Sequence, residues 1–193
     1  GLGVGDLMIF PNDSNFTIGD VLKSFQYFKP TTPFRTKFDY DNLLYLVAGE
    51  LTARVSKQSW ESFIDENIIE TLGMKNSSAS LSNMADATTI AIPHGFIENK
   101  LMPLETKKGN TNMNGAAGGI WSSATDICKW MLAQLNKGKY GTDLNTILFS
   151  EQQQQEMWRM HTPMNRKSDP HSPFKSHFYG YGLGWFVSDF NGY

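Results

Sequence analysis

The feature that most constrains the fold is a run of apolar residues with helical spacing that begins shortly after residue 40. Leucine, valine and alanine side chains recur there every three to four positions: Leu43, Leu44, Val47, Ala48, Leu51 and Val55. This period is that of an α-helix with one face turned to a core. Asp39 or Asp41 can cap it, where the helix dipole favours negative charge. We therefore expect a helix that starts just after Tyr40.

The rest of the chain is predicted to hold further amphipathic helices, loops and a final aromatic strand. Caps and apolar periods predict helices over 18–27, from 59 to 73, from 123 to 138 and after 150. Short strands are expected around 88–92 and 96–101, and a surface loop over 161–178. Tyr181 to Phe190 has the pattern of a strand, and Asn191-Gly192 is a strong hairpin-turn signal.

Two helices carry more specific expectations. The helix after Ser123 should begin with a capping box to Asp126 and bury Ile127, Trp130, Met131 and Leu135. Cys128 lies in the same helix and is expected to be a core or half-buried thiol, since a single cysteine forms no internal disulfide. The four glutamines at 152–155 are expected to form a solvated helix face.

Composition excludes some classes of function. The chain has 193 residues, a net charge of −2 and 19% charged residues, whereas nucleic-acid binders usually carry a basic excess. No apolar run approaches the roughly 18 residues of a membrane span. The sequence opens without Met or a signal peptide and stops just after a hairpin-turn signal. We therefore expect a piece of a longer parent protein.

Tyr40 and Asn42 are the candidate catalytic residues. Alternate residues of an extended segment share a face, so both side chains can enter one cleft. A tyrosine at a helix start can act as a proton acceptor, and an asparagine can hold a substrate amide and an ammonium together. A Tyr-x-Asn pair also occurs by chance, as a capped helix start with an aromatic wedge, in a structural helical domain.

Several ordered motifs place this pair in context. They are "FRTKFDYDNLLYLVAGELTARVSKQSWESFIDENIIETLGM", "NGAAGGIWSSATDICKWMLAQLNKG" and "YGLGW". In this order they resemble the serine β-lactamase and penicillin-binding protein superfamily, in particular the class C β-lactamase-related hydrolases. The matching positions are Phe38, Tyr40, Asn42, Gly49, Leu72, Gly73, Met74, Gly118, Gly119, Asp126, Trp130 and Tyr181 to Trp185.

The resemblance implies catalytic roles for Tyr40 and Asn42, and it also shows that two motifs of the family are missing from this sequence. Tyr40 would be the general base for a nucleophilic serine, and Asn42 would orient the substrate amide and bind the motif lysine. That serine and lysine belong to an S-x-x-K motif before Tyr40, and a third motif, K-T-G or H-x-G, follows Y-G-x-G-W. Neither is found here. The apolar run that ends in Phe10 and Pro11 is a weaker candidate for the substrate rim, with Phe10 as its binding residue.

Other candidate residues are set aside. Ser172-Pro-Phe-Lys175 spells S-x-x-K, but it follows Tyr40 and lies among prolines, so it is expected to be a chance match. His94, His161, His171 and His177 are expected to be scattered surface histidines and not a zinc site. We expect no metal and no organic cofactor.

The sequence therefore predicts an α+β chain: a mainly helical lobe of a β-lactamase/transpeptidase-like fold with a terminal strand of an incomplete antiparallel sheet. The helical lobe is expected over about 6–160, a loop over 161–178 and the start of the sheet over 179–193.

The implied parent is a serine hydrolase acting through an acyl-enzyme on a β-lactam, a D-Ala-D-Ala-type peptide (carboxypeptidase) or an ester (esterase), with this chain inactive alone. The alternative is a non-catalytic peptidoglycan- or peptide-binding module. The resemblance also implies a periplasmic or extracytoplasmic parent, and the expected partners are a small-molecule or peptide substrate and the rest of that parent chain.

Overall fold

The computed structural model describes residues 17–84, 89–104, 115–165 and 174–193. The chain divides into two compact units, and each is described by itself. The described residues of the first unit are 25–41 and those from 129 onward, and those of the second are 17–24 and 42–128, less the gaps. The division falls between Asp41 and Asn42 and again between Cys128 and Lys129, inside helix α5 (Ala124–Leu135). The sequence-based division into lobe, loop and sheet stays a prediction.

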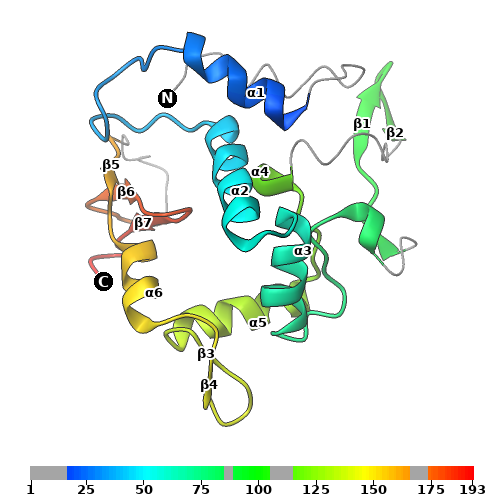
Figure 1. Ribbon diagram of the computed structural model, residues 1–193, viewed down its shortest axis with the longest axis vertical. Helices are drawn as coiled ribbons and strands as arrows, with labels where there is room; N and C mark the ends of the chain where they lie inside the picture. The colour runs from blue at the N-terminus through cyan, green and yellow to red at the C-terminus, as the bar shows by residue number, and fades with distance from the viewer. Residues whose placement is uncertain (1–16, 85–88, 105–114, 166–173) are drawn as a thin grey trace. The chain divides into compact units, whose positions relative to one another are not determined.

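Helix α2 (Asn42–Ser56) organises the second unit and confirms the helix expected after Tyr40. It packs against α1 (Ile18–Ser24), α3 (Trp60–Ile64) and α4 (Gly115–Gly118), as Figure 1 shows. Leu43 and Leu46 are 0% and 3% exposed and form its buried face. Gly49 faces the methyl group of Ala116 on α4, and a side chain there would collide with it. Glycine is therefore required for the close approach of these two helices.

The helix predicted from Ser59 to Gly73 forms, but in two geometries. Ser59 caps α3, its hydroxyl oxygen accepting the backbone N–H of Ser62 at 3.0 Å. The chain then continues as a π-helix, Asp65–Glu70, and Gly73 ends it with a φ of +64°. The carboxylate of Asp65 accepts the N–H of Ala79 at 2.7 Å. The first residue of the π-helix therefore holds, by this hydrogen bond, the segment that leads into the short 3-10 helix η4 (Leu81–Asn83).

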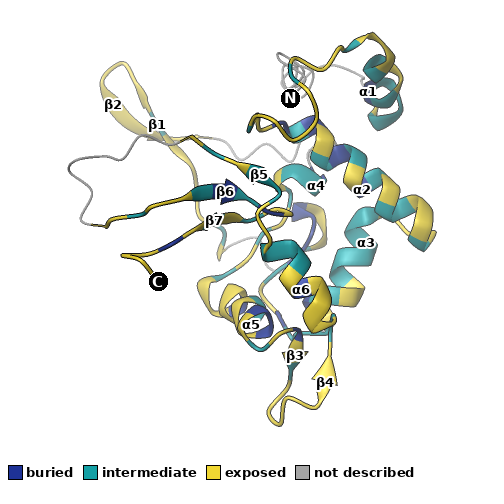
Figure 2. Cartoon of the chain, turned by 90° about the vertical axis from the view of Figure 1, so that its left-hand side faces the viewer, coloured by how far each residue is buried: buried dark blue, intermediate teal, exposed yellow. Residues whose placement is uncertain are grey.

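The strands expected around 88–92 and 96–101 are wrong in position. Residues 89–92 form no strand, and residue 88 lies outside the described residues. Instead β1 (His94–Ile97) pairs antiparallel with β2 (Lys100–Pro103). Glu98 and Asn99 both have positive φ, 49° and 62°, which is the geometry of a tight hairpin turn. Figure 2 shows this hairpin exposed along almost its whole length.

Helix α5 begins as predicted. The hydroxyl oxygen of Ser123 accepts the N–H of Asp126 at 3.2 Å. The Asp126 carboxylate is 1% exposed and accepts the N–H of Asn76 at 2.6 Å and the hydroxyl of Ser77 at 3.0 Å. Asp126 therefore joins a distant loop to the helix start.

The predicted buried face of α5 is wrong at three of its four positions, and the fourth, Trp130, is half-buried. Ile127, Met131 and Leu135 are 42%, 51% and 66% exposed, and Cys128 is exposed as well. Besides Asp126, the buried side chains of the helix are Ala133 and Gln134, each 1% exposed, so the buried face is the neighbouring one. Gln134 is an unusual core residue, since neither polar atom of its side chain has a hydrogen-bond partner in the described part of the chain.

In the first unit, α6 (Glu151–Trp158) starts with the cap expected at Ser150. Ser150 and Gln153 form a reciprocal capping box. The expected solvated glutamine face is wrong at one position, because Gln154 is 6% exposed and its amide lies 3.4 Å from the Gln134 carbonyl. The rest of the unit adds a 3-10 turn, η2 (Phe25–Tyr27), and a small hairpin of β3 (Lys139–Tyr140) with β4 (Thr146–Ile147).

The C-terminal part forms an antiparallel sheet in the order β5-β6-β7: β5 (Thr162–Pro163), β6 (Tyr179–Tyr181) and β7 (Phe186–Ser188). The single strand predicted over 181–190 is wrong, because a turn closed by Gly182 N–H and Trp185 C=O separates β6 from β7. The Asn191-Gly192 turn is confirmed: both residues have positive φ, and Phe190 and Tyr193 exchange two backbone hydrogen bonds. Helices and small antiparallel sheets together make the α+β class that the sequence predicts.

Candidate active site

Tyr40 belongs to the first unit and follows two residues without regular secondary structure. Phe38 and Tyr40 both contact the ring of Tyr181, with centroids 5.2 Å and 6.5 Å away. This shared contact is what alternate residues of an extended segment provide. The Tyr40 and Tyr181 rings meet edge to face at 90°, and Tyr40 is still 45% exposed. The phenol is therefore supported on an aromatic ring and is not enclosed in an aliphatic core.

Asn42 belongs to the second unit and is the first residue of α2. It is half-buried, between two buried neighbours: Asp41 is 5% and Leu43 is 0% exposed. The chain thus passes from a segment without regular secondary structure into a helix within the motif itself. The catalytic roles of Tyr40 and Asn42 stay predictions.

Two sequence candidates cannot be compared with the structure. Phe10, the candidate for the substrate rim, lies outside the described residues, and so does Ser172 of the second S-x-x-K match. Lys175 is described, and its backbone N–H donates to the side-chain oxygen of Asn191 at 2.9 Å.

The histidines are separately placed. His94 is exposed and its Nδ1 lies 2.8 Å from the Ile92 carbonyl oxygen. His161 was expected at the surface, but its side chain is 8% exposed, with Nε2 3.1 Å from the carbonyl oxygen of Glu156 and 3.3 Å from its carboxylate. His171 lies outside the described residues. Within the described ranges, no group of three or more His, Cys, Asp or Glu side chains is arranged to hold a metal ion.

No pattern in the sequence indicates the hydrogen-bond network around the Asp189 carboxylate. Asp189 is 7% exposed, and its Oδ1 accepts hydrogen bonds from the N–H groups of His177 and Phe178 and from the Ser176 hydroxyl. Its Oδ2 accepts the N–H of Gly192 at 3.0 Å and lies 2.7 Å from His177 Nδ1. Burial raises the pKa of the Asp189 carboxyl, but the hydrogen bonds from His177, Ser176 and Phe178 outweigh burial and hold the pKa well below its usual range. Asp189 thereby ties the strand entry to the terminal turn.

We expect Asp189→Asn to lower the free energy of unfolding at neutral pH, and the difference from the unmodified chain to shrink in acid. The folded-state pKa lies below the unfolded value of about 3.9, so the stabilisation is present above about pH 4. It is lost as the pH falls through the folded-state pKa. Urea unfolding curves between about pH 7 and pH 3 measure this difference. The exposed Asp143, changed to Asn, is the control, and a difference that stays constant in acid would contradict the role of Asp189.

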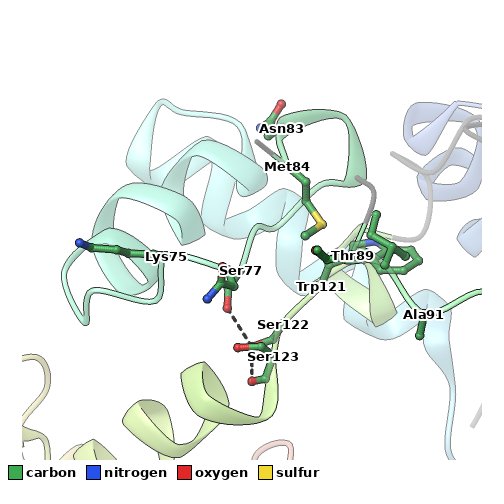
Figure 3. A pocket seen from close by; sticks show the side chains of 11 residues that line it. Lys75, Ser77, Asn83, Met84, Thr89, Ala91, Trp121, Ser122 and Ser123 are labelled. Carbon is green, nitrogen blue, oxygen red and sulfur yellow. Dashed lines mark hydrogen bonds between the residues drawn. The ribbon is translucent and has the colours of Figure 1, made fainter. Parts of the chain in front are cut away.

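A cavity of about 570 Å³ lies in the second unit (Figure 3). Its lining is mostly hydroxyl, amide and apolar: Lys75, Asn76, Ser77, Asn83, Met84, Thr89, Ile90, Ala91, Trp121, Ser122 and Ser123. The Ser77 and Ser122 hydroxyls bond each other at 2.8 Å, while Ser77 also donates to Asp126. The Lys75 side chain points away from this pair. Among its described lining residues, the cavity brings no lysine to a serine hydroxyl, so it does not supply a serine–lysine nucleophile.

Comparison with known proteins identifies the family. Residues 2–193 match the family model described as Beta-lactamase. The chain belongs to the β-lactamase family. Solved structures of similar fold include the octameric penicillin-binding protein homologue from Pyrococcus abyssi, with a TM-score of 0.64, 21% identity and 94% of this chain covered. The D-stereospecific amidohydrolase from Streptomyces sp. has a TM-score of 0.62, 16% identity and 93% of this chain covered.

Among curated relatives of this β-lactamase-family chain is "Unguisins hydrolase ungD'" from Aspergillus campestris (strain IBT 28561), 27% identical over 124 residues, or 63% of this chain. The chain spans 23% of that relative, 38% of the Pyrococcus abyssi protein and 47% of the Streptomyces amidohydrolase. It therefore corresponds to less than half the length of each. No helix among the described residues is long and apolar enough to cross a membrane.

Proposed function

We propose that this chain is part of a serine hydrolase whose parent protein acts by acyl transfer on a β-lactam, a D-Ala-D-Ala-type peptide, another amide or an ester. The observation that carries the proposal is the half-exposed phenol of Tyr40, held against the Tyr181 ring at the position of the Y-x-N motif. Membership of the β-lactamase family supports it, as do relatives described as an unguisins hydrolase and a D-stereospecific amidohydrolase.

The proposed reaction has two halves. In the first, Tyr40 accepts the proton of a serine hydroxyl as the serine oxygen attacks the substrate carbonyl. The leaving group takes up that proton as its bond to the carbonyl carbon breaks, and the acyl group stays on the serine as an ester. In the second half, Tyr40 accepts a proton from the water that attacks this ester, and the serine oxygen takes up that proton as the ester bond breaks, which releases the acid and restores the serine. Asn42 orients the substrate amide and the lysine.

The serine and lysine are proposed to come from an S-x-x-K segment of the parent outside these 193 residues, because none precedes Tyr40 in this sequence. The oxyanion of the tetrahedral intermediate needs preorganised donors, which the proposal assigns to backbone amides of the parent protein. The proposal includes the periplasmic or extracytoplasmic location that the family resemblance implies.

The test compares the parent protein with the isolated chain. Each is incubated with benzylpenicillin and with a nitrophenyl ester, and intact-mass spectrometry follows covalent addition. We expect the parent to gain one acyl group on a serine, and the isolated chain to gain none and to turn over neither substrate. Hydrolysis by the isolated chain that disappears on Tyr40→Phe would show that the nucleophile lies within it. A parent that is neither acylated nor active would count against the hydrolase itself.

A further inference from the structure

We propose that Tyr181 is a positioning residue for Tyr40: its ring fixes the orientation of the phenol that the proposed function uses as a base. The inference rests on the proposed function for its chemical meaning. Its structural content concerns only the first unit, in which both rings lie. Nothing in the sequence motif Y-G-x-G-W by itself indicates this contact.

Tyr181 is fixed by strand pairing on both sides. It lies on β6, the central strand, opposite Thr162 of β5 and opposite Phe186 of β7. Its carbonyl oxygen also accepts the N–H of His161 at 2.9 Å. A side chain on a central strand projects in a direction set by its register, so the Tyr181 ring is a fixed reference point in this unit.

Three aromatic rings brace one another at this point. The centroids of Tyr181 and Phe186 are 5.0 Å apart, those of Phe38 and Tyr181 are 5.2 Å apart, and those of Phe38 and Phe186 are 6.0 Å apart. These separations are those of favourable tilted and edge-to-face pairs. Because Phe38 is held in the triangle, the backbone two residues before Tyr40 is held with it.

Tyr40 adds a fourth ring to the edge of this group. Residues 38–40 form no helix or strand, so no ladder of backbone hydrogen bonds orients the Tyr40 side chain. Its ring meets Tyr181 at 90° and 6.5 Å, an edge-to-face contact that favours one ring orientation over others. A base must be held close to its productive geometry, since displacement by about 1 Å can lower the rate about 10²-fold. The Tyr181 ring provides that restraint.

The experiment uses the 193-residue chain with isotope-labelled tyrosine, and Tyr40→Phe assigns the Tyr40 signals. In the unmodified chain we expect nuclear Overhauser effects between the ring protons of Tyr40 and Tyr181. Tyr181→Phe keeps a ring and should preserve the Tyr40 chemical shifts. Tyr181→Leu should lower the order parameter of the Tyr40 amide from the rigid range near 0.85 to below about 0.6. Tyr140→Leu, on β3, is the matched control and should leave Tyr40 unchanged.

Circular dichroism confirms that each variant is folded. If Tyr181→Leu does not fold, the ring-to-ring effects in the unmodified chain still decide, and their absence overturns the proposal. A folded Tyr181→Leu chain with unchanged Tyr40 signals overturns it as well. In the parent protein, Tyr181→Leu should lower kcat about 10²-fold with little change in KM, and Tyr181→Phe should restore it. If Tyr40→Phe leaves turnover intact while the spectra behave as expected, the proposed function fails and the ring contact stands.

Discussion

Tyr40→Phe is expected to lower kcat of the parent protein by about 10²- to 10⁴-fold, the usual contribution of a positioned general base. The substitution removes only the hydroxyl group. The ring remains to meet Tyr181 edge to face, so the extended segment keeps its support. Because an interaction made chiefly in the transition state is lost, KM should change far less than kcat. Steady-state kinetics on a nitrophenyl ester and a β-lactam measure both quantities.

The matched control is Tyr27→Phe, the same chemical change at a tyrosine of the same unit that is 80% exposed. It should leave both kinetic constants unchanged. Thermal unfolding of the two variants should coincide with that of the unmodified protein. A Tyr40→Phe protein that is fully folded and retains full turnover would remove Tyr40 from the mechanism, whatever substrate the parent takes.

The local elements could be predicted because their signals lie within a few residues. The caps at Ser59 and Ser150 and the left-handed helix end at Gly73 each depend on neighbours within one or two helical turns, and all three formed as expected. The Asn191-Gly192 turn is likewise a two-residue signal. The motif that contains Tyr40 was visible for the same reason.

The failures concern contacts between residues far apart in the sequence. The apolar stripe of α5 gave the correct helix but the wrong buried face, because packing selected the side that holds Ala133 and Gln134. The capping motif at Ser123 gave no indication that Asp126 also accepts a hydrogen bond from a loop 50 residues earlier in the chain. Asp189 and His177 are 12 residues apart in the sequence, so no local motif indicates their contact. Sequence periodicity specifies an element but not its partner.

The contact between Tyr40 and Tyr181 belongs to this second class. The two residues are 141 positions apart in the sequence (181 minus 40). The pairing of β6 with β7 sets the direction of the Tyr181 side chain, and its ring contacts the ring of Tyr40. The family resemblance included both residues, but as separate motifs. The structure adds that they share one aromatic group in the first unit, which gives the Y-G-x-G-W segment a physical reason to accompany Y-x-N.

The largest expected effect on stability is that of Leu43→Ala. Leu43 is 0% exposed at the start of α2, directly after Asn42, so its truncation leaves a cavity in the core of the second unit. Removing a fully buried leucine side chain costs about 2–5 kcal/mol, the sum of lost apolar burial and of the cavity that remains. Alanine favours the helix, so none of this loss comes from helix propensity. Chemical unfolding of the isolated chain measures it.

The neighbouring residue provides the matched control. Leu44 undergoes the same chemical change on the same helix, but it is 45% exposed, so Leu44→Ala should cost well under half as much, about 1 kcal/mol or less. Equal losses for the two variants would mean that α2 does not bury the face that contains Leu43 and Leu46. Because Asn42 is carried by the first turn of this helix, a loosened α2 should also weaken the placement of its amide. In the parent protein, Leu43→Ala should therefore lower kcat at temperatures where the protein is still folded, whereas Leu44→Ala should not.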